Sequence, residues 1–266
     1  MLELEDGRKV MDCISSWWVN LHGHAEPAIA QAIAVQAQQL EQVIAAGFTH
    51  HPAEELAHRL VEKLPDRCAR VFYSDNGSTA VETALKIAVQ YWRNLGFPRR
   101  SRFLAFEGGY HGDTVGAMSV GARSGFTEAF EDLLFETDYI PFPATYHGDP
   151  TAEEREQQAL AELEALLADR ADRCAAMIVE PLVQGAAGMR MCRPQFLARV
   201  ELLLRRFGVL EIYDEVLVGF GRTGSWFACS KAGTAPDLVC LAKGLTGGFL
   251  PMGATVCSEE IYDAFR

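Results

Sequence analysis

The sequence predicts an α/β fold, built on a mostly parallel sheet of seven strands with helices on both faces. From about residue 68 onward, short β-rich runs alternate with longer stretches of helical periodicity. Strands that alternate with helices tend to pair in parallel, because each helix carries the chain back across the sheet. With 266 residues, 49% of them hydrophobic, the chain is also able to bury a sizeable core.

The predicted elements follow one another in a regular order. The strand-like runs, rich in β-branched, aromatic and other apolar residues, are 69–74, 102–106, 138–142, 175–181, 208–214, 237–242 and 253–258. The helical stretches between them are 78–95, 151–169 and 194–207. We assign residues 51–266 to this large domain. Residues 1–50 lack the alternation and contain a helix expected at 27–45, so we predict that they form part of a small N-terminal lobe.

Charge and composition argue against several functions. A formal net charge of -12 disfavours nucleic acid as a partner, because binding to phosphates requires clustered basic residues. No run approaches the roughly 18 apolar residues of a membrane span. Seven cysteines are scattered without a C-x-x-C pair, which predicts reduced thiols in a cytoplasmic protein. The close histidine pairs, at 22 and 24 and at 50 and 51, are too weak a signal to predict a metal site.

The segment "DEVLVGFGRTG", residues 214–224, contains the G-x-G-x-x-G spacing of a dinucleotide-binding turn. Such a turn needs a strand directly before the first glycine and a helix directly after the last one. Here residues 215–218 separate the strand from Gly219, and no sustained helical periodicity follows Gly224. We therefore interpret the glycines as a loop that packs close to a neighbouring element rather than as a dinucleotide site.

Two ionisable residues follow consecutive strands along the chain. Asp214 ends one strand, and Lys243 directly follows the next. Ligands of open α/β sheets bind at the carboxyl ends of strands, so both side chains are expected at one rim. A lysine after an apolar strand is partly desolvated, which lowers its pKa and favours a Schiff base with an aldehyde. The pair suits pyridoxal 5'-phosphate (PLP), whose pyridine nitrogen also needs a carboxylate. An ordinary salt bridge at the rim is the structural alternative.

A phosphate site is predicted where "DNGSTAVETALK" opens a helix after a strand. Backbone N–H groups near Gly77 and Ser78 would bind the phosphate, and the serine hydroxyl would add a donor. A capping box is the alternative, because Ser78 and Glu82 lie nearly in that register, and both roles can coexist. The loop "GGYHGDT" adds Tyr110, whose ring is suited to stacking on the cofactor. A histidine in such a turn, here His111, is more often simply hydrogen-bonded.

These motifs, in this order, resemble those of the class III, or ω-amino, aminotransferases of fold type I. The matching segments are "DNGSTAVETALK", "GGYHGDT", "IVEPLVQGAAGM", "DEVLVGFGRTG" and "LAKGLTGG", and the likeness covers nearly the whole chain. The resemblance implies a PLP-dependent aminotransferase that takes a small-molecule keto acid and an amino donor. It also implies a homodimer with the site at its interface.

Several segments resemble one subfamily, which converts 8-amino-7-oxononanoate to 7,8-diaminononanoate in biotin biosynthesis. They are "SSWWVNLHGHAEP", "GFTHHP", "VQYW" and "YHGDTVGAMSV". The likeness implies S-adenosylmethionine or lysine as the amino donor. A broad-specificity ω-amino acid or diamine aminotransferase and a PLP-dependent aminomutase remain open as alternatives.

The resemblance assigns roles to individual residues. Lys243 matches the catalytic Schiff-base lysine, which contacts both cofactor and substrate. The other cofactor-binding positions are Asp214 at the pyridine nitrogen, Gly77 and Ser78 at the phosphate, and Tyr110 and Val216 on the two ring faces. Trp17 and Trp18 match tryptophans of the substrate wall, to which Tyr110 also belongs, although one of the two tryptophans could be a core residue.

The sequence also departs from the family pattern. Leu217 stands where many members have Gln, which favours the subfamily, and Val218 stands where Thr is usual. Glu180 matches a glutamate at a strand end, and Glu211 lies inside an otherwise apolar strand, where an unpaired carboxylate is costly. The resemblance implies a further C-terminal lobe with a carboxylate-binding arginine and a phosphate-binding threonine. We therefore expect a longer gene product and expect residues 1–266 alone to be inactive.

Overall fold

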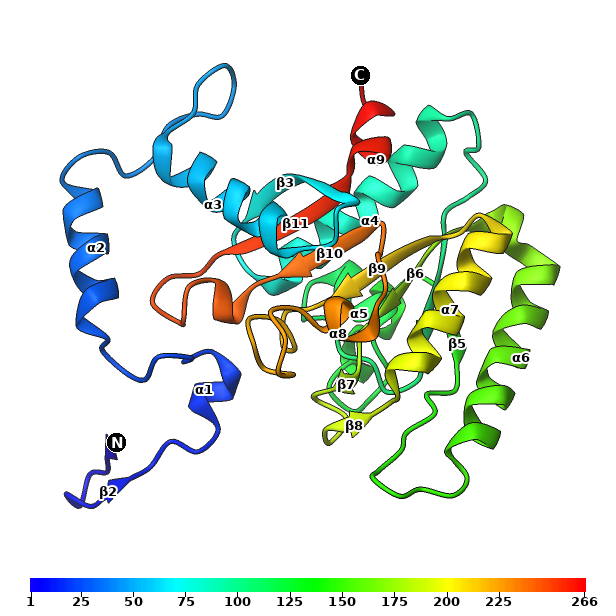
Figure 1. Cartoon of the computed structure of the whole chain (residues 1–266), viewed down its shortest axis with the longest axis horizontal. Coiled ribbons are helices and arrows are strands. Elements are labelled where there is room, and N and C mark those ends of the chain that lie inside the picture. The colour runs from blue at the N-terminus through cyan, green and yellow to red at the C-terminus, as the bar shows by residue number, and fades with distance from the viewer.

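The computed structural model describes residues 1–266 and is centred on one seven-stranded sheet (Figure 1). The strand order is β3–β11–β10–β9–β6–β4–β5. Strands β10, β9, β6, β4 and β5 run parallel, and β11 is antiparallel to both of its neighbours. The bounds are β3 Cys68–Ser74, β4 Arg102–Phe106, β5 Thr137–Ile140, β6 Cys174–Val179, β9 Leu210–Asp214, β10 Leu238–Leu241 and β11 Gly253–Ser258. The prediction of a mostly parallel seven-stranded sheet is confirmed.

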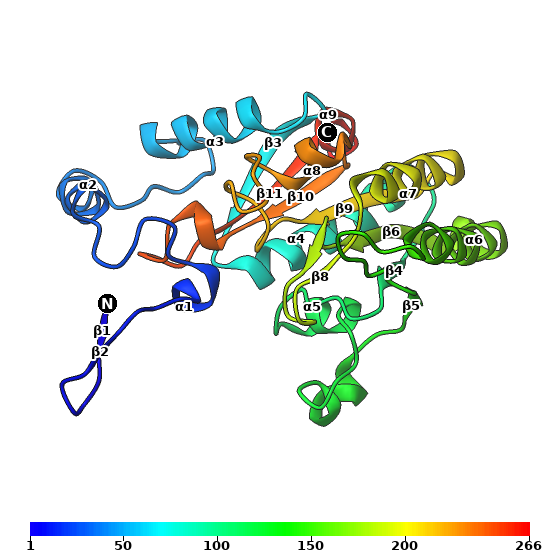
Figure 2. The same cartoon turned by 60° about the horizontal axis from the view of Figure 1, so that its bottom comes forward.

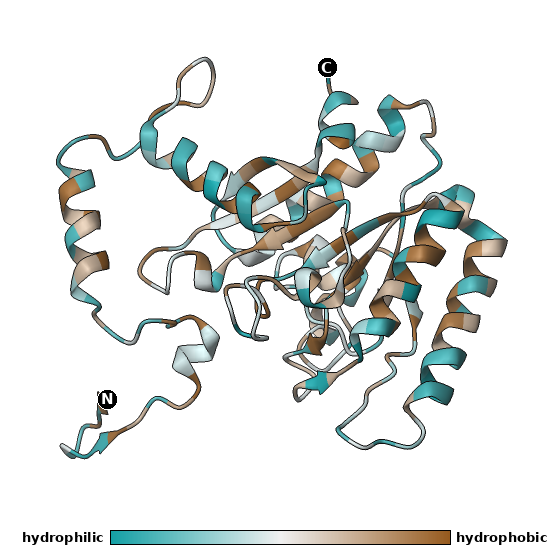
Figure 3. Cartoon of the chain, in the orientation of Figure 1, coloured by the Kyte–Doolittle hydropathy of each residue, from teal (hydrophilic) through white to brown (hydrophobic).

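Helices cover both faces of the sheet, because alternate residues of its strands enter two separate cores. One core receives Met177 and Val179 of β6 together with α3, α6, α7 and α8. The other receives Ala176 and Ile178 of the same strand together with α4, α5 and α9. Figure 2 shows α3 and α7 on one side of the strands and α4 and α5 on the other. Hydrophobic residues are concentrated along the central strands (Figure 3).

The helices predicted at 78–95, 151–169 and 194–207 are present, and they begin and end close to those positions. The bounds of the helices in these layers are α3 His51–Lys63, α4 Gly77–Asn94, α5 Val115–Val120, α6 Ala152–Arg170, α7 Pro194–Phe207, α8 Ala228–Ala232 and α9 Glu259–Asp263. Short 3-10 turns lie at Glu128–Leu133, Ala171–Arg173 and Lys243–Leu245, and a two-stranded ribbon pairs β7 Val183–Gln184 with β8 Arg190–Met191. None of the helices combines the length and apolar character of a membrane span.

The start of α4 differs from the predicted capping register. Asn76 is the N-cap: its Oδ1 accepts the Thr79 N–H at 3.0 Å, and the Thr79 hydroxyl accepts the Asn76 N–H at 2.9 Å. The suggested Ser78–Glu82 box is therefore wrong, because Glu82 instead accepts the Gly116 N–H at 2.6 Å. Capping by Asn76 leaves the first N–H groups of α4 free for other partners.

The N-terminal region contains β1 Leu2–Glu3, β2 Lys9–Val10, α1 Ser15–Trp18 and α2 Pro27–Ala37. No residue between 1 and 50 is buried. The helix expected at 27–45 is shorter than predicted and ends at Ala37. Ile29 and Ile33 of α2 are half-buried, whereas Leu40 and Ile44 beyond it are exposed, so a longer helix would gain no apolar burial to offset the entropy cost of extending it. Figure 1 shows α1 and α2 beside the layered part of the molecule.

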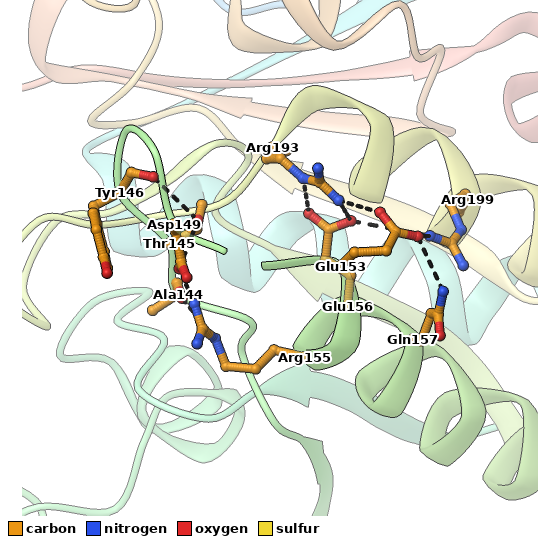
Figure 4. Close-up of polar contacts among 10 residues, drawn as sticks. All are labelled: Ala144, Thr145, Tyr146, Asp149, Glu153, Arg155, Glu156, Gln157, Arg193 and Arg199. Carbon is orange, nitrogen blue, oxygen red and sulfur yellow. Dashed lines mark hydrogen bonds and ion pairs between the residues drawn. The ribbon is translucent and has the colours of Figure 1, made fainter. Parts of the chain in front are cut away.

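Helices α6 and α7 are joined by an ion-pair network (Figure 4). The guanidinium of Arg193, just before α7, donates two hydrogen bonds to Glu156 of α6, each at 2.6 Å. Glu156 is 1% exposed, while Glu153 and Arg199 at the rim of the network are exposed. The buried carboxylate therefore has a charged partner, which its burial requires.

Candidate cofactor and active site

Asp214 and Lys243 lie at the carboxyl ends of neighbouring parallel strands. Asp214 is the last residue of β9 and pairs in register with Cys240 of β10, three positions before Lys243. Asp214 is 4% exposed. Burial lowers the pKa of Lys243, and the negative charges of Asp214 and Glu180 act in the opposite direction. The two groups that the sequence placed at one rim therefore lie within electrostatic reach of each other.

The Asp214 carboxylate is held by two groups. Its Oδ1 accepts the Val216 N–H at 3.1 Å, and its Oδ2 lies 2.8 Å from Nδ1 of His111. His111 is 4% exposed, so this contact is shielded from water. The sequence predicted only that His111 is an ordinary hydrogen-bonded histidine of a turn. Its pairing with Asp214 was not predicted. The available signal was that its loop follows β4, whose carboxyl end lies at the same rim.

The N-terminus of α4 lies against both strand ends. A Cβ atom added to Gly77 would lie 2.9 Å from Cγ1 of Val216 and 3.5 Å from Cβ of Ala242. Glycine is therefore required for this close approach. The N–H groups of Gly77 and Ser78 have no acceptor within the protein, and the Ser78 hydroxyl accepts the Asp113 N–H at 3.2 Å. These groups form an anion-binding corner beside the carboxylate and the amine.

Tyr110 and Glu180 form the next part of the rim. One oxygen of Glu180 accepts the Tyr110 N–H at 2.9 Å, and the other accepts the Gly185 N–H at 3.0 Å. Burial raises the pKa of Glu180 to about 7, and the charge of Asp214 adds to this effect. Burial likewise raises the pKa of Tyr110 to about 12, which keeps its hydroxyl protonated, and that hydroxyl donates to Asp113 at 3.1 Å. Glu180 thus fixes the backbone of the Tyr110 loop.

The structure brings Trp18, but not Trp17, to the amine. The Lys243 Nζ lies 5.2 Å from the centroid of the Trp18 ring. Trp17 is 70% exposed. Residues 15–18 all have positive φ, between 47° and 67°, and so form a left-handed turn. Such a conformation costs about 1–2 kcal/mol for each non-glycine residue, so other contacts must hold it in place.

The departures from the family pattern have different structural settings. Leu217 packs against Gly185, where a Cβ atom would lie 2.0 Å from the leucine Cδ2. Val218 is buried in the core. Glu211 is 2% exposed and neither carboxylate oxygen has a hydrogen-bond partner. Burial raises the pKa of Glu211 well above the ordinary value, because an unpaired charged carboxylate is unfavourable in the protein interior.

The glycines at 219–224 form a loop in the structure, and no helix opens directly from it. Gly221 and Gly224 have φ near 90°, and the next helix, α8, begins at Ala228. The carboxylate of Glu215 accepts the N–H groups of Ala228 and Cys229, each at 2.7 Å. This loop is therefore anchored at its far end by a buried carboxylate. No group of three potential metal ligands comes together anywhere in the structure.

The residues at the rim fit PLP. An amine with a lowered pKa can bond an aldehyde, and a buried carboxylate can pair with a protonated pyridine nitrogen. The free N–H groups at the start of α4 suit a phosphate, and the absence of a Cβ at Gly77 leaves the corner open. The fold and these groups together fit the cofactor-binding domain of the PLP class of proteins.

The chain belongs to the class-III aminotransferases, since that family (Aminotransferase class-III) matches residues 1–266. It is 61% identical over 264 residues to the adenosylmethionine-8-amino-7-oxononanoate aminotransferase of Synechococcus elongatus, covering 99% of this chain and 62% of that protein. The enzyme of the same name from Geobacter sulfurreducens is 44% identical over 263 residues, covering 98% of this chain and 58% of the relative.

Solved structures agree with this assignment. The adenosylmethionine-8-amino-7-oxononanoate aminotransferase of Methanocaldococcus jannaschii superposes with a TM-score of 0.89 at 37% identity, covering 99% of this chain and 59% of the other. An amine transaminase from an uncultivated Pseudomonas species, in its PLP-bound form, superposes with a TM-score of 0.92 at 37% identity. The match covers 98% of this chain and 60% of the other. The predicted family and fold type are confirmed, and the family is PLP-dependent. The chain spans about three fifths of the length of these relatives.

Proposed function

We propose that the whole protein is a PLP-dependent aminotransferase that converts 8-amino-7-oxononanoate to 7,8-diaminononanoate, with S-adenosylmethionine or lysine as amino donor. The observation that carries the chemistry is the convergence of Lys243, Asp214 and the N-terminus of α4 at one rim. The choice of substrate is supported by the names of the relatives from S. elongatus and G. sulfurreducens. Because the chain spans only part of these relatives, the activity is proposed for the full-length protein.

In this proposal the residues at the rim hold the cofactor. PLP supplies an aldehyde and an electron-withdrawing ring. The Lys243 amine would hold the aldehyde, the charge of Asp214 would pair with the ring nitrogen, and Gly77 and Ser78 would bind the phosphate. Tyr110 and Val216 would contact the two faces of the ring. His111 holds the Asp214 carboxylate in place at 2.8 Å.

Lys243 also performs the proton transfer. With the amino donor bound in its place, the freed Lys243 amine would take a proton from the substrate carbon as general base and deliver it to the cofactor carbon as general acid. Its lowered pKa increases the neutral fraction that can accept a proton. Trp18, whose ring lies 5.2 Å from Nζ, forms a wall beside the reacting amine, and we place Trp17 on the same substrate side.

The arrangement of the complete enzyme is also part of the proposal. Residues 1–50 belong to a small N-terminal lobe, and residues 51–266 form the cofactor domain. A homodimer with the site at its interface and a cytoplasmic location follow from the resemblance and from the scattered cysteines. A broad ω-amino acid or diamine aminotransferase is the second candidate, because a solved neighbour is named an amine transaminase.

The proposed reaction is tested with the full-length protein, PLP and 8-amino-7-oxononanoate against a panel of donors that contains S-adenosylmethionine, lysine, alanine and a diamine. We expect 7,8-diaminononanoate with one of the first two donors, detected by mass spectrometry. If amino groups are transferred only to other keto acids or aldehydes, the broad-specificity assignment replaces ours. No transfer to any acceptor would reject both.

A further inference from the structure

The carboxylate of Glu82, on α4, caps the start of a neighbouring helix. Its Oε1 accepts the Gly116 N–H in the first turn of α5 at 2.6 Å. Thr114, the N-cap residue of α5, makes no capping bond with its side chain, and its buried hydroxyl has no partner. A carboxylate at this position satisfies a free N–H group and interacts favourably with the helix dipole. Glu82 therefore supplies the cap that α5 lacks in its own sequence.

Gly116 is the residue that lets this carboxylate approach α5. A Cβ atom added to Gly116 would lie 2.8 Å from Cδ of Glu82 and closer still to its Oε2. The φ of Gly116 is not positive, and the residue lies in a buried helical turn, so the backbone conformation suits alanine equally well. What requires glycine here is the contact with Glu82, because even a methyl group would displace the carboxylate.

A second side chain of α4 contacts the same stretch of chain one helical turn earlier. Ser78 lies four residues before Glu82, so the two side chains share a face of α4. The Ser78 hydroxyl accepts the Asp113 N–H at 3.2 Å, and a Cβ atom at Gly112 would lie 2.6 Å from the Ser78 Cβ. Residues 112–116 therefore lie against the first turns of α4, held by two of its side chains.

Helix α5 is also tied to the loop that precedes it. The Ala122 N–H, just beyond the helix, donates to the Gly109 carbonyl at 2.7 Å. Gly109 directly precedes Tyr110 and His111, the two residues that this loop contributes to the rim. The start of the loop is thus bonded at the far end of α5, and the end of the loop is the turn that Glu82 caps. A shift of α5 would therefore move both side chains.

We propose that Glu82 is a positioning residue, which holds α5 against α4 so that the loop before α5 keeps Tyr110 and His111 at the cofactor site. This role rests on the proposed function only in that the rim binds PLP. It connects the helix whose N-terminus forms the anion-binding corner with the loop that carries the tyrosine expected on the cofactor ring. Glu82 acts through α5, not by contact with cofactor or substrate.

The test uses three variants of the full-length protein and a matched control. Glu82→Ala removes the acceptor, whereas Gly116→Ala keeps Glu82 and displaces its carboxylate. Glu82→Gln keeps an oxygen that can accept the same N–H. Glu201→Ala is the control, because Glu201 of α7 accepts the Ala235 N–H at 2.8 Å on the other face of the sheet. This control removes a comparable bond from the same domain and leaves the loop untouched.

The first readout is hydrogen–deuterium exchange of peptides that cover residues 107–122 in the cofactor-free protein. Loss of a hydrogen bond to a charged group changes a local equilibrium by about tenfold or more, so exchange should accelerate about tenfold in Glu82→Ala and Gly116→Ala. Glu82→Gln should stay closer to the wild type, and Glu201→Ala should match it in these peptides. Alanine ordinarily favours a helix over glycine, so slower or unchanged exchange in Gly116→Ala would overturn the proposal.

The second readout separates positioning from general stability. The dissociation constant for PLP, measured from the visible absorbance of the bound cofactor, should rise severalfold in Glu82→Ala and stay unchanged in Glu201→Ala. If Glu82 acts through the loop, its effect should shrink in the Tyr110→Ala background, because the two residues then act on the cofactor as one unit. Effects that multiply fully in the double variant would show independent action and contradict the proposal.

The two readouts also separate this role from the proposed reaction. If the wild type binds no PLP or transfers no amino group, the proposed function fails, while accelerated exchange in both alanine variants still shows that Glu82 holds the loop. If Glu82→Ala does not fold, as judged by circular dichroism, Gly116→Ala carries the test with the same measurements. Unchanged exchange and an unchanged dissociation constant in Gly116→Ala would then refute the positioning of the loop by Glu82.

Discussion

Individual residues with strained backbones gather around the rim that carries the site. Lys243 has a φ of 45°, Phe220 of the glycine-rich loop has 57°, and Trp17 and Trp18 have 59° and 67°. Each such residue costs roughly 1–3 kcal/mol and persists only where its surroundings hold it. At Lys243 the left-handed conformation turns the chain directly after β10, which presents the amine beside the end of β9. Strain is therefore concentrated where side chains of three segments must meet.

Glu211 is a residue whose replacement should stabilise the protein. It is buried, its oxygens have no partner and its pKa is raised above the ordinary value of 4.5. The folded state therefore binds a proton more tightly than the unfolded state, so stability falls as pH rises above about 4.5. Glu211→Met should increase the free energy of unfolding by about 1–3 kcal/mol at pH 8, and by less at pH 5.

Urea denaturation of the full-length protein at pH 5 and pH 8 measures this difference. Glu211→Gln is the matched control, because it keeps the shape of the protonated acid and cannot titrate. The free energy of unfolding of Glu211→Gln should therefore lack the part of the pH dependence that comes from titration of Glu211. A wild type more stable at pH 8 than Glu211→Met would show that the buried carboxyl has a stabilising partner in solution.

Among the secondary-structure elements, the sheet could be predicted best. Buried strands such as β6 and β9 are mostly apolar in sequence because both of their faces are covered. Such a run can be recognised from neighbouring residues alone. The extent of α2 could not be predicted, because it depends on whether a partner covers residues beyond Ala37. The helix α3 was not predicted, although Pro52 lies in its first turn and Leu60 reaches the core. The Asn76 cap was missed because Ser78 offered a competing register.

The contact between α6 and α7 gives a prediction at this scale. Arg193→Met would leave Glu156 buried, with its nearest remaining cation, Arg199, 4.0 Å away. Removing one partner of a fully buried ion pair costs about 3–5 kcal/mol, but Arg193 is itself 38% exposed and Arg199 remains near Glu156, so the expected cost is about 1–3 kcal/mol. We expect a loss of that order in the free energy of unfolding of the full-length protein, measured by urea denaturation.

The matched control is Arg206→Met. Arg206 pairs with Glu164 across the same two helices, but both side chains are largely exposed. An exposed pair contributes at most about 1 kcal/mol, so this variant should be nearly as stable as the wild type. Equal effects of the two substitutions would show that burial of Glu156 has no energetic consequence and would contradict our interpretation of the network.

At the scale of the whole molecule, the site is assembled from segments far apart in the chain. The rim itself was predictable, because parallel strands place their carboxyl ends together and a helix N-terminus binds anions wherever it is exposed. The pairing of His111 with Asp214 and the bridge from Arg222 to Trp18 were not predictable, since both join loops that are adjacent only after folding. Sequence patterns thus located the groups, and tertiary packing decided their partners.

Borohydride reduction of the full-length protein with PLP, followed by peptide mapping, shows whether this rim is the cofactor site. We predict a reduced adduct on Lys243 and its loss, together with the visible absorbance of the bound cofactor, in Lys243→Ala. Lys86→Ala, on the exposed side of α4, is the control and should retain both. An adduct on another lysine, or an equal amount of adduct in Lys243→Ala, would contradict the account.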